Sequence, residues 1–376
     1  MVRRQTKKVK SNQYIQNKSL SKATINKLTQ YLLKTFDVPD LKDTLHLVRN
    51  AVQTLEASSC ENRTEWVLCK NTCAKTLRDA IKTETESTAY MLRVLTNSVI
   101  SVDGHSIEFE LNTPLTGLWA EDAANIRIQS VGNPKKRPRL IIGLGPSASG
   151  KTFWTKKLLH MFAETDENFP RTFLTIDGGI YRSSSIIYQY ILQAAKESCF
   201  AGIQNLVEAN MHILDQSLFY AGTIKQHIND FLRKQTPISL YVPETCSDCG
   251  FARFKSCEQK HKPYIDITKD SDPIAVLIWQ HKRAEDCTFG KEFRCVGCTE
   301  SGESREKSEG KKYSNAMYEH SMNEGMRALL RSPNIRYKIH VSGSDDRKSI
   351  VEDYSENPVK PTEDFMNKYN YVYRKV

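Results

Sequence analysis

The sequence of 376 residues contains no run of 18 or more apolar residues, so we expect no transmembrane helix. The amino terminus is basic but lacks the apolar stretch of a secretory signal, which predicts a cytoplasmic location, with a nuclear location as the alternative. Apolar residues make up only 39% of the chain, below the roughly 45–50% of average globular domains. We therefore expect polar tails or a polar insertion around an ordinary core.

Acidic residues are absent from the first 36 positions, which hold nine lysines and arginines. The rest of the chain has 45 basic and 44 acidic residues, so the net charge of +10 belongs to the amino-terminal segment. We interpret residues 1–20 as a disordered basic tail, either simply solvated or in contact with an anionic partner such as nucleic acid or a membrane surface. A second basic run at 135–139 is either a linker or a nuclear localisation signal.

Helical periodicity predominates in the region from 21 to 135. Ile25, Leu28 and Leu32 recur with the spacing of one helix face, and Asp40 is suited to cap the helix that follows. Residues 107–111 alternate in the manner of a half-buried strand. We predict a mainly helical amino-terminal region to which the sequence assigns no chemistry.

From residue 136 the pattern changes to short apolar runs separated by helical stretches. These runs do not alternate, which is typical of strands buried on both faces of a parallel sheet. The sequence therefore predicts an α/β domain over 136–343, with a five-stranded, doubly wound parallel sheet of the P-loop kinase type, and a charged tail over 344–376. The expected strands occupy 139–144, 172–176, 238–242, 274–279 and 335–341.

The stretch from 145 to 152 reads Gly-Pro-Ser-Ala-Ser-Gly-Lys-Thr, which is the P-loop (Walker A) pattern G-x-x-x-x-G-K-[ST]. An apolar strand precedes it and a helical pattern follows, the context in which backbone N–H groups bind phosphates at a helix N-terminus. We expect Lys151 to reach the β- and γ-phosphates and the Thr152 hydroxyl to ligate Mg²⁺, with ATP as nucleotide. The predicted nucleotide site comprises Gly145, Pro146, Ser147, Ala148, Ser149, Gly150, Lys151 and Thr152.

Two acidic residues end later strands of the predicted sheet. Asp177 follows the second strand, ahead of two glycines and Arg182, and Glu244 ends the third. Ligands of such sheets bind outside the carboxyl ends of the strands. We expect Asp177 to face a substrate, Arg182 to clamp an anionic one, and Glu244 to enter the Mg²⁺ shell or orient a hydroxyl. The alternatives are a surface turn and a solvated loop.

With the P-loop, the stretch Asp177-Gly-Gly-Ile-Tyr-Arg182 and the pair Glu244-Thr245, the sequence resembles the zeta-toxin-like P-loop kinases over about residues 139–343. The resemblance implies transfer of the γ-phosphoryl group of ATP to a hydroxyl of a small molecule, often a sugar nucleotide. It also implies that Asp177 accepts the hydroxyl proton and that Arg182 positions the substrate. A polynucleotide kinase and a slowly hydrolysing nucleotide-dependent switch or scaffold are the alternatives.

The segment from about 245 to 313 reads as a cysteine-rich insertion that ends in a lid. A charged run at 299–313 precedes the fifth predicted strand, where a mobile segment can bring cations to the transferring phosphoryl group. Arg305 is the preferred catalytic cation, because one guanidinium group can bind two phosphate oxygens at once. Lys311 and Lys312 are further candidates. A solvated charged helix face is the alternative.

Six of the ten cysteines lie between 246 and 298. Without a secretory signal, thiols or metal ligands are better readings than disulfides. Two C-x2-C pairs can supply four thiolates to one structural Zn²⁺, and a second arrangement uses one pair with Cys257 and His261. The preferred zinc ligands are Cys246, Cys249, Cys295 and Cys298, and reduced thiols are the alternative.

Overall fold

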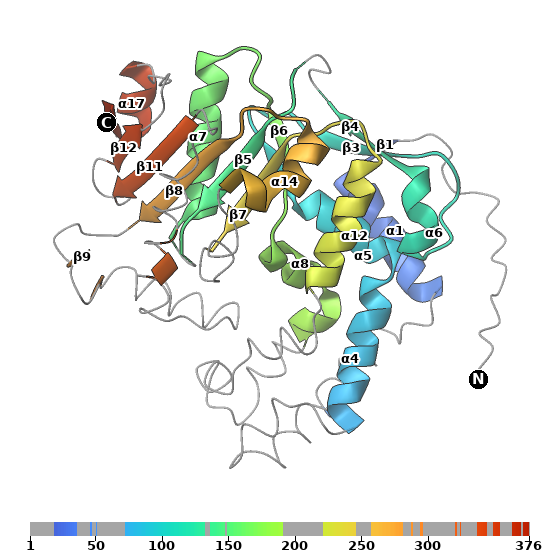
Figure 1. Cartoon of the computed structure of the whole chain (residues 1–376). Helices are drawn as coiled ribbons and strands as arrows, with labels where there is room; N and C mark the ends of the chain where they lie inside the picture. The colour runs from blue at the N-terminus through green and yellow to red at the C-terminus, as the bar shows by residue number, and fades with distance from the viewer. Residues whose placement is uncertain are drawn as a thin grey trace.

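The computed structural model describes residues 19–35, 72–131, 136–146, 149–190, 221–245, 257–280, 337–343, 349–353, 363–369 and 371–375, with 46, 50, 287–288, 294–295, 320–321 and 324. At its centre lies an eight-stranded sheet in the order β13-β12-β11-β8-β5-β7-β6-β2 (Figure 1). All five predicted strands belong to this sheet and run parallel to one another. They are β5 (Leu140–Leu144), β6 (Thr172–Thr175), β7 (Leu240–Glu244), β8 (Ile274–Gln280) and β11 (Tyr337–Gly343).

The prediction of five strands is wrong in number, because three further strands extend the sheet at its two ends. β2 (Val99–Ser101) pairs antiparallel with β6, and β12 (Ser349–Asp353) pairs antiparallel with β11. β13 (Tyr371–Lys375) continues parallel to β12, after helix α17 (Glu363–Tyr369). The residues after 343 are therefore not simply a tail. Their strands are short and carry charged residues, which makes their composition resemble that of a tail.

Helices cover both faces of the central sheet, as the doubly wound arrangement requires. Leu140 and Ile142 of β5 pack into one core together with residues of several helices, whereas Ile141 packs into a second core with α7 (Lys151–Thr165) on the other face. Successive side chains of a strand point to opposite faces, so a strand in this position needs apolar residues throughout. The helices of the first core include α1 (Lys22–Thr35), α5 (Thr88–Asn97), α8 (Gly178–Ser184), α12 (Ala221–Arg233) and α14 (Cys257–Thr268).

The amino-terminal region combines helices with a small sheet. The predicted face of α1 is buried, with Ile25, Leu28 and Leu32 at most 6% exposed, and α4 (Thr72–Thr85) precedes α5. β1 (Ser19–Leu20), β3 (Ile107–Leu111) and β4 (Ile126–Ser130) form an antiparallel sheet in the order β1-β3-β4. α6 (Trp119–Asp122) and the 3₁₀ turn Ala123–Asn125 connect β3 to β4.

Strand 107–111 is confirmed, and its burial alternates. Asp40 and residues 1–18 lie outside the described residues. Because α1 and α5 share a core with β5, and β2 joins the central sheet, this region packs directly on the α/β part.

Candidate functional site

The carboxyl ends of three neighbouring strands bring the P-loop, Asp177 and Glu244 to one edge of the sheet. Leu144, the last residue of β5, is in register with Glu244 at the end of β7. Thr175 of β6 is in register with Tyr241 of β7, so Asp177 emerges near the end of β7 as well. Neighbouring strands lie about 4.8 Å apart. Glu244 is therefore one strand, and Asp177 two strands, away from the strand that leads into the P-loop.

The P-loop depends on glycine at both of its ends. Gly145 and Gly150 have φ angles of 137° and 77°, a region that other residues rarely adopt. A Cβ atom at Gly145 would lie 2.4 Å from the backbone oxygen of Ile278 in β8, so the space as well as the angle requires glycine. Gly150 occupies the N-cap position of α7 and offers no capping side chain. The N-terminus of this 15-residue helix can therefore accept an anion.

The Lys151 side chain folds back and binds the start of the P-loop. Its Nζ donates hydrogen bonds to the backbone oxygens of Gly145 (2.8 Å) and Pro146 (2.5 Å). Thr152 is exposed in the first turn of α7, and Ser149 is fully buried with no hydrogen-bond partner for its Oγ among the described residues. A phosphate bound at this helix end would take over the Lys151 ammonium from the two carbonyls.

Two of the predicted nucleotide-site residues, Ser147 and Ala148, lie outside the described part of the chain. Of the remaining six residues, four lie between β5 and α7, and Lys151 and Thr152 are the first two residues of α7, as the sequence pattern predicts. The context required of a P-loop, a buried strand followed directly by a helix, is thus present around these residues.

Asp177 is the half-buried N-cap of α8. Its Oδ1 accepts a hydrogen bond of 2.9 Å from the backbone N–H of Gly179. Arg182 lies in the last turn of the same helix and is half-buried too. The predicted pair therefore sits on one short helical segment, and whatever holds this helix also sets the position of both side chains.

Glu244 lies close to two lysines and a histidine from α12 and α14. Lys260 Nζ lies 3.3 Å from Oε2, while His261 Nε2 and Lys225 Nζ lie 3.6 and 4.0 Å from Oε1. Burial on its own raises the pKa of Glu244, but the neighbouring His261 and the charges of Lys225 and Lys260 outweigh it and hold the pKa well below its usual range. Glu244 already balances protein charges, an arrangement better suited to fixing these ammonium groups than to ligating Mg²⁺.

Lys225 links this cluster to the end of β6. Its ammonium group lies over the ring of Tyr264, 5.4 Å from the ring centre. Burial lowers the pKa of Lys225, but interactions with Tyr264, Glu244 and Asp177 raise it by more, so the net shift is upward. Lys225 thus stays charged beside Glu244. Sequence reasoning missed it, as it missed Lys260, because only the strand order shows that α12 and α14 face this edge.

Several predicted side chains lie outside the described residues, namely Arg305, Lys311, Lys312, Cys246, Cys249 and Cys298. Cys295 is described only through its backbone, in β10 (Arg294–Cys295), where it pairs with Cys287 of β9 (Cys287–Thr288). In the described part of the chain, no three His, Cys, Asp or Glu side chains gather in a way that could hold a metal ion. Zinc binding therefore stays a prediction.

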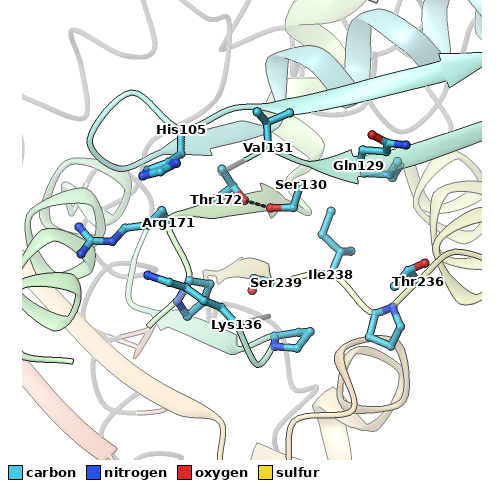
Figure 2. Close-up of a pocket in the computed structure, with 14 residues that line it drawn as sticks. His105, Gln129, Ser130, Val131, Lys136, Arg171, Thr172, Thr236, Ile238 and Ser239 are labelled. Atoms are coloured by element: carbon cyan, nitrogen blue, oxygen red, sulfur yellow. Dashed lines mark hydrogen bonds between the residues drawn. The ribbon is translucent and has the colours of Figure 1, made fainter. Parts of the chain in front are cut away.

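A cavity of about 460 Å³ lies at the opposite, amino-terminal edge of the sheet (Figure 2). Its lining includes Thr172 at the start of β6 and Ser239 just before β7. The hydroxyls of Thr172 and Ser130 lie 2.8 Å apart and join the central sheet to β4, as Figure 2 shows. The P-loop follows the carboxyl end of β5, and Asp177 follows the carboxyl end of β6, at the other edge of the sheet. This cavity is therefore not part of the candidate site.

Within the described residues, no helix is both long enough and apolar enough to cross a bilayer. No protein-family model matches the sequence, and no curated protein is significantly similar to it. One solved structure comes from a study of the PezAT chromosomal toxin–antitoxin system of Streptococcus pneumoniae. The alignment covers 65% of this chain and 81% of the chain in that structure, at 12% sequence identity and a TM-score of 0.34. A likeness this low supports no conclusion, and the candidate site is defined by its own residues.

Proposed function

We propose that the protein is an ATP-dependent kinase that transfers the γ-phosphoryl group to a hydroxyl of a small molecule, such as a nucleotide or sugar nucleotide. One observation carries the proposal. A P-loop with its two required glycines ends β5, and Asp177 ends β6 on the same edge of a parallel sheet. A nucleotide at the N-terminus of α7 and an acceptor beside α8 would face each other across the end of β7.

On the nucleotide side, the proposal assigns phosphate binding to the backbone N–H groups at the start of α7 and to Lys151. The exposed Thr152 hydroxyl is an oxygen donor of the kind that Mg²⁺ prefers, and it lies next to Lys151 in the first turn. When bound, Mg²⁺ would neutralise charge on the β- and γ-phosphates. These groups would hold the phosphate chain at the N-terminus of α7.

On the acceptor side, Asp177 would take the proton of the attacking hydroxyl, and Arg182 would hold an anionic part of the acceptor. Lys225 and Lys260 lie against Glu244. In this proposal their positive charges would stabilise the negative charge that accumulates during transfer. Arg305 is proposed as a further cation from the lid. The proposed reaction therefore rests on positioning and charge, with one proton transfer.

The test combines γ-labelled ATP, the full-length protein and a metabolite extract, followed by identification of the labelled species. Wild type should label a small molecule, and Asp177→Asn should lower this transfer at least about 100-fold while nucleotide affinity barely changes. A collapse of nucleotide affinity in Asp177→Asn would instead make Asp177 a metal-shell or structural residue. Release of free phosphate with no labelled acceptor would favour a switch or scaffold, and stimulation by single-stranded nucleic acid would favour a polynucleotide kinase.

A further inference from the structure

Helix α8, which places Asp177 and Arg182, has little stability of its own. It has seven residues and begins with two glycines. Helices this short are unstable in isolation, and glycine weakens them further. Figure 1 shows α8 beside α5, and both helices contribute side chains to one core. The position of α8 must therefore be set by the elements that contact it.

Glu84, in the last turn of α4, receives four hydrogen bonds at the C-terminal end of α8. Its Oε1 accepts from Arg93 Nη2 (2.6 Å) and from the backbone N–H of Ile186 (2.7 Å). Its Oε2 accepts from Ser185 Oγ (2.6 Å) and from the backbone N–H of Ile187 (3.3 Å). The Glu84 side chain is only 1% exposed. It therefore acts as a buried capping group for the helical residues that follow α8.

Side chains of α5 bind α8 from the same side. Tyr90 Oη donates a hydrogen bond of 3.0 Å to the backbone oxygen of Tyr181. Arg93 Nε donates to the backbone oxygen of Ser184, and Asn97 Nδ2 donates to Ser184 Oγ, each at a distance of 3.0 Å. Arg93 thus contacts both Glu84 and α8 from a largely buried position. Burying this ion pair costs desolvation energy, but its directional bonds fix one position of the helix, which apolar packing alone would not do.

The P-loop is formed by elements other than those in this hydrogen-bond network around α8. Its strand, its helix and the backbone that approaches Gly145 come from β5, α7 and β8. The four side chains Glu84, Tyr90, Arg93 and Asn97, here named the α8 clamp, contact α8 and the residues that follow it. A disturbed clamp should therefore move Asp177 and Arg182 relative to a nucleotide whose own site is intact.

We infer that the α8 clamp consists of positioning residues for phosphoryl transfer, supplied by the amino-terminal helices. The clamp acts through Asp177 and Arg182 and does not touch the reacting atoms. This inference rests on the proposed kinase function. A misplacement of about 1 Å at a reacting group can cost about 100-fold in rate. The amino-terminal region is accordingly an integral part of the acceptor side of the site.

The test uses the double variant Tyr90→Phe/Asn97→Ala in the full-length protein, which removes two hydrogen bonds to α8 while keeping the buried ion pair. The matched control is Thr96→Val on the same helix, because Thr96 Oγ1 donates to the backbone oxygen of Leu92 within α5. We expect the double variant to lower kcat/KM for the acceptor about 10- to 100-fold, with nucleotide affinity within twofold of wild type. The control should match wild type in both quantities.

A second measurement separates this inference from the proposed function. Amide hydrogen exchange at residues 178–184 should be faster in the double variant than in the control, whether or not an acceptor is known. Wild-type acceptor kinetics in a double variant that is folded would overturn the inference. Equal losses of nucleotide affinity and transfer would also overturn it, because they would indicate general destabilisation. If wild type itself transfers no phosphate, the proposed function fails, and the exchange data alone decide whether the clamp holds α8.

Discussion

Oδ1 of Asp177 accepts a hydrogen bond of 2.9 Å from the backbone N–H of Gly179, so one carboxylate caps α8 at the edge of the sheet that also carries the P-loop. The cap and the proposed proton acceptor are therefore the same side chain. Asparagine can replace aspartate as a cap but cannot take up a proton in the same way, whereas alanine can do neither. The two roles can be separated by substitution.

We expect Asp177→Ala to be about 1 kcal/mol less stable than Asp177→Asn, because alanine loses the N-cap hydrogen bond. Both variants should lack transfer activity, since neither keeps the carboxylate. Urea unfolding monitored by circular dichroism would measure the stability difference. Equal stability of the two variants would contradict the capping role of Asp177. Transfer by Asp177→Asn at the wild-type rate would contradict its role as proton acceptor.

Lys151→Ala should abolish turnover while leaving the fold intact. Lys151 lies in the first turn of α7 and bonds to the loop itself, outside the two cores. Lys156→Ala is the matched control, since Lys156 is exposed on the same helix. Nucleotide titration and turnover measurements would compare the two. Turnover of Lys151→Ala within a factor of a few of wild type would rule out the P-loop assignment.

Gly145→Ala should disrupt the P-loop by two effects, an unfavourable φ angle and a Cβ atom 2.4 Å from a backbone oxygen. Gly104→Ala isolates the first effect, because Gly104 also has a positive φ angle, of 77°, but nothing lies within 4 Å of a Cβ atom there. We expect Gly104→Ala to cost about 1–2 kcal/mol and to keep nucleotide binding. Gly145→Ala should lose binding, and retention of wild-type affinity would show that the loop differs from the described one.

Glu244→Gln should change how stability depends on acid pH. The pKa of Glu244 is lowered in the folded protein, so its contribution is fully present above the unfolded-state pKa of about 4.5 and is lost as the pH falls toward the folded value. Wild type should therefore lose more stability than Glu244→Gln below about pH 4.5. At pH 7 the variant should be about 1–3 kcal/mol less stable, because Lys225 and Lys260 lose their partner.

The control for this comparison is Glu164→Gln, at an exposed position on α7. Thermal or urea unfolding between about pH 3 and 7 would give the three curves. Parallel curves for wild type and Glu244→Gln would show that the charged cluster does not stabilise the folded state.

Protein purified without chelator should carry about one zinc per chain, as the two C-x2-C pairs predict. The double variant Cys249→Ser/Cys298→Ser should lose the metal, whereas Cys60→Ser, outside the cysteine-rich segment, should keep it. Elemental analysis would decide between them. Well under one metal per wild-type chain would reject the zinc site in favour of reduced thiols.

Much of the fold follows from the sequence because buried parallel strands need apolar residues on both faces. The run that becomes β5 and the P-loop after it are explicit in the sequence, and the alternation of Ile107, Phe109 and Leu111 predicts β3. β12 and β13 were missed, since their short, charged sequences resemble those of a solvated tail.

The candidate site could be predicted only where its residues are close in the chain. Asp177 and Arg182 are five positions apart, and the P-loop is continuous. Lys225, Lys260 and Glu244 meet because of the strand order, which local patterns do not contain. Glu84 resembles any exposed helical glutamate in the sequence. Its burial depends on α8, which lies about 100 residues further along the chain.

The antiparallel pairing of β2 with β6 has a consequence for the biogenesis of the protein. Ile100 and Phe173 are register partners, so the sheet is completed at this end only after about 70 further residues have been synthesised. Until then β2 has no partner in the central sheet. A fragment that began at residue 136 would conversely expose the hydrogen-bonding edge of β6, and such an edge promotes association between copies. The amino-terminal region therefore supplies the strand that covers this edge of β6.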